Sequence, residues 1–379
     1  MVSTLIHHAW ALELLGSLNV LRLLLGTAFL TLSISALDPS VSCLAADSPR
    51  QDHLGLPTLA SADQASLTRQ AELGKRLFFD TRLSGNGSVS CGTCHQPGKA
   101  FTDGKPVAEG IHGQKGARNT PTILNSVFLT SFFWDGRRTS LVAQAQDPFV
   151  NPVEHGLTSH DELLQIVRQD LTYRQAFRAL SEQELPITLE QVAQALSAYV
   201  SSLRAGNSAF DRYYYGGDRS ALTGETISGL ELFRGRAGCV TCHQIQHEWA
   251  LFTDGQFHRL GVGMSRIDSS LAELTSRAVE LSVHGLDHRV LGNRDMAELG
   301  RFLVTHDPKD IGKFKTPSLR NAALTAPYMH DGSVPTLEEA VDRELYYRSF
   351  ESGRPLLLSP REKATLVEFL NALTSAPQQ

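Results

Sequence analysis

The sequence has little excess charge of either sign: its 379 residues include 35 Lys and Arg and 40 Asp and Glu, so the formal net charge is −5. A chain without a broad basic field is not expected to bind nucleic acid. Cysteine is also scarce, and five residues argue against a fold held together by disulfides. Hydrophobic residues nevertheless make up 41% of the chain, which excludes wholesale disorder and allows folded cores.

Long hydrophobic runs are scarce too. The uncharged run 23–36 follows Arg22 and is succeeded by small residues, and it is shorter than the about 20 residues that a membrane-spanning helix needs. A basic flank, a short apolar stretch and a small-residue exit are typical of a secretory signal. We therefore predict that residues 1–46 direct export to the periplasm and are removed together with Cys43. Retention of this segment as a membrane anchor is the alternative.

Four of the five cysteines lie in two copies of one motif, Cys-x-x-Cys-His. The copies consist of Cys91, Cys94 and His95 in the first half, and Cys239, Cys242 and His243 in the second. This order is typical of covalent c-type haem, in which two thiols add to the porphyrin vinyl groups and the adjacent histidine binds the iron. Zinc would need further ligands near each pair, and a thioredoxin-like site would need a βαβ pattern that the sequence lacks. We predict two covalently bound haem c groups.

The residues around the two motifs repeat as well. Phe-Thr-Asp-Gly follows each motif, at 101–104 and at 252–255, and a Gly-x-x-Leu-Phe segment precedes each, at 74–78 and at 229–233. This repetition indicates an ancient duplication that produced two related domains with one haem each. We predict domains at 47–205 and 206–379, because Gly-Asn and Gly-Gly pairs interrupt the helical pattern after Ala205.

Helical signals dominate the chain, and strand alternation is scarce. Helix starts are predicted where Thr188 precedes Gln191, where Thr336 precedes Glu339, and where Ser359 and Pro360 precede Glu362. The first of these helices is expected to run to Gly206. Long Gly- and Asn-rich loops lie between the helices, and loops of this length usually bind a ligand or carry chemistry. The pattern predicts an all-α fold with long loops wrapped around the haems.

Further segments carry a resemblance to a known family. They are Leu77–Asp80, Ser84–Gly87, Arg118–Thr122, Phe133–Arg137, Phe314–Asn321 and Ala326–Gly332. With these segments and both haem motifs, the chain from Leu67 to Thr374 resembles the bacterial di-haem cytochrome c peroxidases, which include the MauG-type enzymes. The resemblance implies two all-α cytochrome c-like domains in the periplasm, with electron transfer between the two irons across the domain interface.

The resemblance also implies site residues near the first haem. Glu154 matches the family's distal carboxylate, which can move a proton between the two oxygens of peroxide and so promote their separation. Gln144 matches a polar residue of the same pocket, and Trp134 matches the residue that passes electrons between the haems. His112 lies one residue from the position at which many relatives carry a second ligand of the first iron. Either His112 binds this iron or the iron is open at rest.

Two more sites follow from the resemblance. Asn119, with the backbone carbonyls of Thr325 and Pro327, matches a calcium site, and oxygen donors from both domains suit that ion. The sixth ligand of the second iron, a methionine in peroxidases and a tyrosine in MauG-type enzymes, falls on Glu344 here. A short shift would supply Tyr346 or Tyr347 instead, so all three stay candidates.

The function implied is a periplasmic peroxidase that reduces hydrogen peroxide with electrons from a small protein, such as a cytochrome c or a cupredoxin. A MauG-like enzyme, which uses peroxide to oxidise a partner protein, is the alternative, and the absence of the methionine ligand motivates it. A di-haem electron carrier without enzymatic activity is the third reading. The sequence leaves open whether the chain forms a homodimer.

Overall fold

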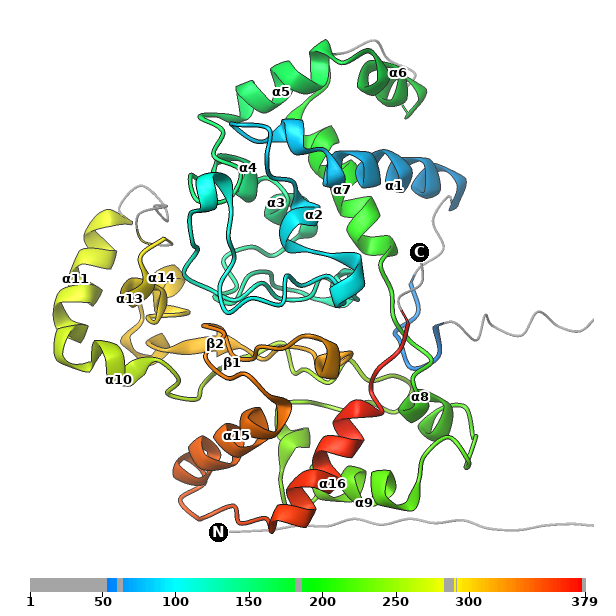
Figure 1. Ribbon diagram of the computed structural model, residues 1–379, viewed down its shortest axis with the longest axis vertical. Coiled ribbons are helices and arrows are strands. Elements are labelled where there is room, and N and C mark those ends of the chain that lie inside the picture. The colour runs from blue at the N-terminus through cyan, green and yellow to red at the C-terminus, as the bar shows by residue number, and fades with distance from the viewer. Residues whose placement is uncertain (1–52, 60–63, 181–185, 283–289, 291, 377–379) are drawn as a thin grey trace, which may run out of the picture. The chain divides into compact units, whose positions relative to one another are not determined.

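The computed structural model describes residues 53–59, 64–180, 186–282, 290 and 292–376 (Figure 1). The predicted export segment and Cys43 lie outside these residues. The described residues belong to one compact unit, Ser48–Gln379. No helix found among them combines the length and the apolar character that crossing a membrane requires.

The first half of this unit is built from helices around one long pair. Helix α1 (Gln64–Phe79) packs across α7 (Leu189–Ser202), as Figure 1 shows. Gly74 permits this crossing, because an added Cβ would lie 1.8 Å from the carbonyl oxygen of Ala195. The other α-helices of this half are α2 (Cys91–Cys94), α3 (Leu141–Gln144), α4 (Asp147–Val150), α5 (His160–Gln169) and α6 (Leu171–Leu180).

The second half repeats this crossing. Helix α9 (Gly224–Arg234) packs on α16 (Pro360–Asn371), and an added Cβ at Gly229 would lie 2.3 Å from the carbonyl oxygen of Thr365. Helix α15 (Leu337–Glu351) packs on α16, and α8 (Ala209–Tyr214) precedes α9. Gly74 and Gly229 are the first residues of the two repeated Gly-x-x-Leu-Phe segments, so the repetition in sequence reappears as two equivalent helix crossings.

An excursion of short elements interrupts the second half. It contains α10 (Met264–Ile267), α11 (Leu271–Leu281), α13 (Arg294–Ala297) and α14 (Phe302–Thr305). Strands β1 (Phe257–Arg259) and β2 (Lys313–Lys315) flank it as an antiparallel pair, with Phe257 opposite Lys315. These two strands form the one sheet in the described part of the chain, so the predicted all-α fold is confirmed.

The three predicted helix starts are confirmed. Thr188 and Ser359 each form a capping box, with Gln191 and Glu362 respectively, and the side chain of Thr336 accepts the backbone N–H of Glu339. The expected end of α7 was wrong, because the helix stops at Ser202 and the backbone of Leu203 leaves the helical region. The carbonyl oxygen of Leu203 accepts a hydrogen bond from the backbone N–H of Asn125, and not from a further turn of the helix.

Buried hydrophobic residues of the described chain form three clusters. One extends from Leu73 to Ala205, a second from Phe210 to Leu373, and a third, between Ile267 and Leu303, belongs to the excursion. The first cluster ends in sequence at Ala205, and the second begins at Phe210. The domains 47–205 and 206–379 stay a prediction, because residues 48–379 form one compact unit.

Candidate functional site

The histidines of the two Cys-x-x-Cys-His motifs are held in the same way. His95 Nδ1 lies 3.0 Å from the carbonyl oxygen of Phe101, and His243 Nδ1 lies 2.9 Å from that of Phe252. Because a carbonyl oxygen only accepts, Nδ1 carries the hydrogen in each neutral ring and Nε2 carries the lone pair. This tautomer is the one in which Nε2 can bind a metal, with the Nδ1 bond fixing the direction of the ring.

The two carbonyls are themselves positioned by the repeated sequence. Phe101 and Phe252 are fully buried, and both have a positive φ, 60° and 52°. The residue before each is fixed by a hydroxyl: Thr122 Oγ1 donates to the carbonyl of Ala100, and Ser318 Oγ donates to that of Leu251, both at 2.6 Å. Thus the repeated Phe-Thr-Asp-Gly segments build two equivalent supports for a metal-binding imidazole.

The four cysteines of the motifs are free thiols. Burial raises the pKa of Cys91, Cys94 and Cys239 to about 12, and it also raises the pKa of Cys242. Within the described residues, Arg348 Nε is buried without a hydrogen-bond partner, and Arg348 Nη1 lies 3.9 Å from Cys242 Sγ. Covalent attachment of a haem would use these features. The thiols of each pair would bond to the haem, the imidazole could bind its iron, and the buried Arg348 Nε is a donor that still lacks an acceptor.

Glu154 lies beside the thiols of the first motif. Its negative charge contributes to the raised pKa values of Cys91 and Cys94, although burial is the larger cause. Burial raises the pKa of Glu154 itself, and the charge of Arg137 and a hydrogen bond from Asn151 offset part of this effect. A raised pKa lets a carboxyl group hold a proton more readily than an exposed one, which suits a general acid–base group.

Arg137 belongs to a buried charge network. Asp135 is fully buried between two guanidinium groups, 2.7 Å from Arg118 Nη1 and 3.0 Å from Arg137 Nη1. Burial alone would raise the pKa of Asp135, but the charges of Arg137 and Arg118 outweigh it and bring the pKa to about 2. Arg118 Nη2 also donates to the carbonyl of Ala297, so the network links the Glu154 pocket to the excursion of the second half.

Two of the other residues predicted near the first haem, Gln144 and His112, differ in their burial. Gln144 ends α3 and is partly buried. His112 is exposed, with Nδ1 3.5 Å from Asn86 Nδ2. Its neighbour Ile111 is buried instead and donates its backbone N–H to the carbonyl of Glu154. The buried position beside Glu154 is therefore filled by an aliphatic side chain, with His112 on the surface.

Trp134 lies next to His330. The two rings meet edge to face with centroids 6.5 Å apart, and Trp134 Nε1 donates to the carbonyl of Asn119. His330 Nε2 donates to the fully buried carboxylate of Glu298 at 2.7 Å, and Arg266 pairs with the other oxygen of Glu298. Trp134 thus lies where the first half contacts the second.

The residues of the predicted calcium site lie on two adjoining loops. Asn119 is buried, donates its side-chain amide to the carbonyl of Lys105, and donates its backbone N–H to the carbonyl of His330. Thr325 and Pro327 lie in the loop that leads to His330, and both are partly buried. An added Cβ at Gly332 would meet the backbone of Pro106, so the two loops are in close contact.

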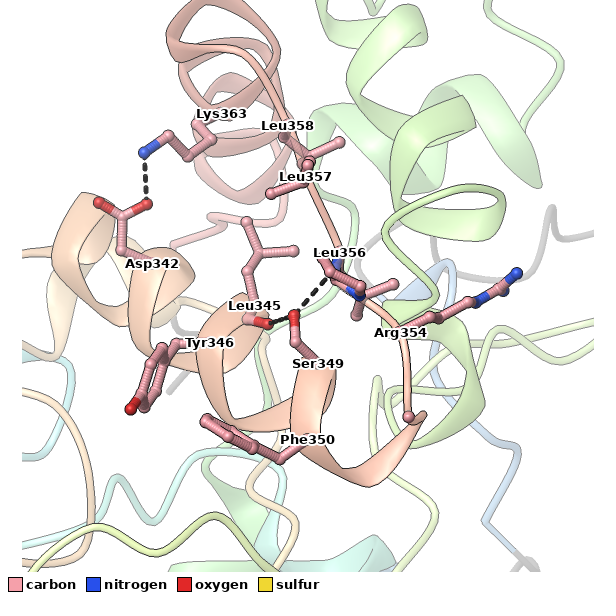
Figure 2. Close-up of a pocket in the computed structure, with 12 residues that line it drawn as sticks. Asp342, Leu345, Tyr346, Ser349, Phe350, Arg354, Leu356, Leu357, Leu358 and Lys363 are labelled. Atoms are coloured by element: carbon pink, nitrogen blue, oxygen red, sulfur yellow. Dashed lines mark hydrogen bonds and ion pairs between the residues drawn. The ribbon is translucent and has the colours of Figure 1, made fainter.

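The three candidates for the sixth ligand of the second haem all lie on α15, but they differ in their surroundings and in their exposure. Glu344 and Arg348 lie near the thiol of Cys239, since their charges change its pKa in opposite directions, although burial has the larger effect. Tyr346 is 56% exposed and lines a surface pocket with Phe350, as Figure 2 shows. Tyr347 is partly buried and lies close to Gly261.

The sequence reasoning missed several residues of these sites. It did not single out Asn151 or Arg137, which act on Glu154, or Glu298, which binds His330. It also missed His155, a buried residue whose Nδ1 lies 2.9 Å from the carbonyl of Leu83. Proximity in sequence could have indicated the three residues near Glu154 and Trp134, whereas no sequence signal connects Glu298 with His330.

The comparisons with known proteins bear on this geometry. The family described as "Di-haem cytochrome c peroxidase" matches residues 68–220. The cytochrome-c peroxidase IdrP2 of Denitromonas iodatirespirans is 36% identical over 95% of this chain and 92% of its own length. This chain belongs to the di-haem cytochrome c peroxidase family. As a member it is a di-haem peroxidase, and the family implies haem c cofactors.

Relatives within the family carry two kinds of name. The methylamine utilization protein MauG of Methylorubrum extorquens is 34% identical over 97% of this chain and 94% of its own. A crystal structure of a MauG-like protein associated with microbial copper homeostasis matches with a TM-score of 0.65 and 31% identity, over 87% of this chain and 95% of that chain. Both peroxidases and MauG-type proteins are therefore similar to this chain over nearly its whole length.

Proposed function

We propose that this di-haem peroxidase works in the periplasm and reduces hydrogen peroxide to water at the first haem, with two electrons from a small redox protein entering at the second. The overall reaction consumes one peroxide, two protons and two electrons and yields two waters. Bound haem supplies an iron that binds peroxide and exchanges electrons. The observation that carries the proposal is Glu154, a carboxyl group with a raised pKa beside the Cys91 and Cys94 thiols.

In this proposal each of the candidate site residues has its own role in the reaction. The carboxylate of Glu154 takes the proton from one peroxide oxygen and returns it to the other, which then leaves as water. The buried Ile111, whose backbone N–H donates to the carbonyl of Glu154, is the candidate apolar neighbour, and Gln144 is the candidate polar one. Trp134, next to His330 at the contact of the two halves, is the candidate relay for electrons.

The test replaces the proton-carrying group alone. Glu154→Gln keeps the size of the side chain and should lower the rate of peroxide consumption with reduced donor by about 10²- to 10⁴-fold. Glu190→Gln, at an exposed position on α7, is the matched control and should retain the full rate. Haem content, read from the absorbance of each purified variant, must equal that of the parent. A Glu154→Gln enzyme with an unchanged rate would refute the role of Glu154.

A second candidate function is the MauG-like oxidation of a partner protein. Glu344, rather than a methionine, matches the family's sixth-ligand position, and it lies with Arg348 near the thiol of Cys239. An anionic oxygen ligand lowers the potential of a haem iron and favours its oxidised states. Mass spectrometry of partner proteins after peroxide treatment distinguishes the two functions, because only the MauG-like reaction leaves a peroxide-dependent modification.

The ligand itself can be tested by spectroscopy of the resting protein. If Glu344 binds the second iron, Glu344→Gln changes the optical and EPR signals of that haem. Tyr346→Phe and Tyr347→Phe then leave both signals as in the parent. A change caused by Tyr347→Phe alone would assign the position to the tyrosine.

Calcium and export complete the proposal. Asn119, with the carbonyls of Thr325 and Pro327, would hold one calcium ion between the two contacting loops, as hard oxygen donors do. Metal analysis after dialysis should give one calcium per chain, and Asn119→Ala should lose it. Export by residues 1–46 predicts a shortened chain in the periplasmic fraction, with the new N-terminus beyond Ala46.

A further inference from the structure

Asn151 holds the turn that carries Glu154. Its backbone carbonyl accepts the N–H of Glu154 at 3.1 Å and that of Gly156 at 2.9 Å. Its side chain makes two further bonds: Oδ1 accepts the backbone N–H of Val153 at 3.0 Å, and Nδ2 donates to Glu154 Oε1 at 2.6 Å. One asparagine therefore organises both the backbone of the turn and the carboxyl group.

The orientation of the Asn151 amide is fixed by its neighbours. The backbone N–H of Val153 can only donate, so the atom that faces it must be the amide oxygen. The amide nitrogen then faces Glu154, where an amide oxygen would repel the carboxylate. An ionised aspartate of the same size would offer acceptors on both sides.

This arrangement distinguishes the two oxygens of Glu154. Oε1 uses a lone pair to accept the bond from Asn151 whether or not the carboxyl group is protonated. A proton on Oε1 would lie close to that donor, so the neutral carboxyl group carries its proton on Oε2. We propose that Asn151 is a positioning residue that reserves Oε2 of Glu154 as the single proton-exchanging oxygen of the peroxide site. The inference rests on the proposed function of Glu154.

Other charged and titratable groups also face Glu154. Arg137 stabilises its charged form and Asp147 opposes it. The thiols of Cys91 and Cys94 lie nearby as well, but in the haem-loaded protein they are uncharged thioethers. Asn151 is the partner that bonds directly to the carboxyl group, whereas these groups act through their charge, so replacing Asn151 isolates the hydrogen bond.

Asn151→Asp is the most informative change. An aspartate keeps the size of the side chain and still accepts the N–H of Val153, so the turn is retained. When ionised, its second oxygen cannot donate to Glu154 and its charge repels the carboxylate. The charged form of Glu154 then loses its hydrogen bond, and the pH at which activity falls on the acid side should rise by about one to two units. The turnover rate at neutral pH should fall while KM for peroxide stays unchanged.

The experiment compares haem-loaded variants by two readouts. One is the pH profile of peroxide consumption, and the other is the infrared C=O stretch of protonated Glu154, identified by its loss in Glu154→Gln and titrated in the absence of peroxide. Asn293→Asp is the matched control, because Asn293 Oδ1 also accepts backbone N–H groups at a helix start and is exposed. Should Asn151→Asp fail to retain haem, Asn151→Ala removes the same donor without adding charge and should shift both readouts in the same direction.

The outcomes separate this inference from the function on which it rests. An upward shift of both the acid limb and the carboxyl titration in the Asn151 variant, with Asn293→Asp unchanged, supports it. Parental values in both readouts, together with an inactive Glu154→Gln, overturn the inference and leave the peroxidase proposal standing. A fully active Glu154→Gln overturns the role of Glu154 and the inference together.

Discussion

Trp134 and His330 face each other across the contact of the two halves of the protein, with ring centroids 6.5 Å apart. They occupy equivalent positions of the repeat, since each precedes an Asp-Gly pair and follows a residue of positive φ, Phe133 and Met329. Two copies of one repeated position therefore lie together, and they differ in chemistry. The tryptophan is the more readily oxidised ring, and the histidine is the one bonded to a buried carboxylate.

This pair leads to a prediction about electron transfer. Trp134→Phe retains an aromatic ring but removes the indole. The rate of electron transfer between the haems should therefore fall about tenfold, which is equivalent to about 1.4 kcal/mol of added barrier. Stopped-flow absorbance after mixing reduced protein with peroxide measures the rate. Trp249→Phe serves as the control for loss of an indole. Equal rates in the parent and Trp134→Phe would exclude the relay.

Acid stability should depend on Asp135. Its pKa of about 2 in the folded protein lies below the ordinary value of 3.8, so its contribution to stability is complete above about pH 4 and is lost as the pH falls towards 2. The contribution amounts to about 2 kcal/mol. Denaturant titrations at pH 6 and pH 3 should show that Asp135→Asn is destabilised at pH 6 and that the deficit shrinks at pH 3. A deficit that does not change with pH would contradict the pairing with Arg118 and Arg137.

Two ion pairs of the second half should differ greatly in their importance. Arg320 is 2% exposed and binds both oxygens of the fully buried Asp211, at 2.8 and 2.9 Å. Asp211→Asn leaves a buried guanidinium without a counter-charge and should cost about 3–5 kcal/mol in the free energy of unfolding. The exposed pair Lys363–Asp342 is the comparison, and Asp342→Asn should cost at most about 1 kcal/mol. Urea unfolding measures both, and similar losses would contradict the prediction.

The two helix crossings predict a third stability effect. Gly74→Ala and Gly229→Ala place a Cβ 1.8 and 2.3 Å from a facing carbonyl oxygen, so the helices must separate. Each change should lower the free energy of unfolding by about 1–3 kcal/mol. Gly224→Ala, where an added Cβ meets nothing within 4 Å, should leave the melting temperature unchanged or raise it. Calorimetry of the three variants tests whether the repeated glycines are required for close packing.

The sequence was most informative where chemistry is local. The helix starts at Thr188, Thr336 and Ser359 depend on residues three positions apart, and the haem motifs on residues within five. The repeated Phe-Thr-Asp-Gly segments indicated duplication, although only the structure relates them to the imidazoles of His95 and His243. Local spacing therefore predicted the helix starts that the structure confirms, and the haem attachment sites stay a prediction from the same kind of pattern.

What the sequence did not reveal depends on contacts between distant segments. Glu298 reaches His330 across an excursion of short helices, and nothing in either segment predicts that meeting. Ile111 is buried, whereas His112, which has a positive φ of 56°, is exposed. The spacing showed that His112 lies one residue from the expected ligand position, but only the structure shows which of the two side chains is buried.

The matching supports of His95 and His243 have a consequence for the division of labour between the haems. A hydrogen bond from Nδ1 to a backbone carbonyl makes an imidazole a stronger donor to its metal, so both histidines would support a bound iron in the same way. A difference in behaviour between two bound haems would therefore have to come from features other than this shared support. The surroundings of the two motifs do differ: the charge of Glu154 acts on the thiols of Cys91 and Cys94, whereas the opposite charges of Glu344 and Arg348 act on the thiol of Cys239.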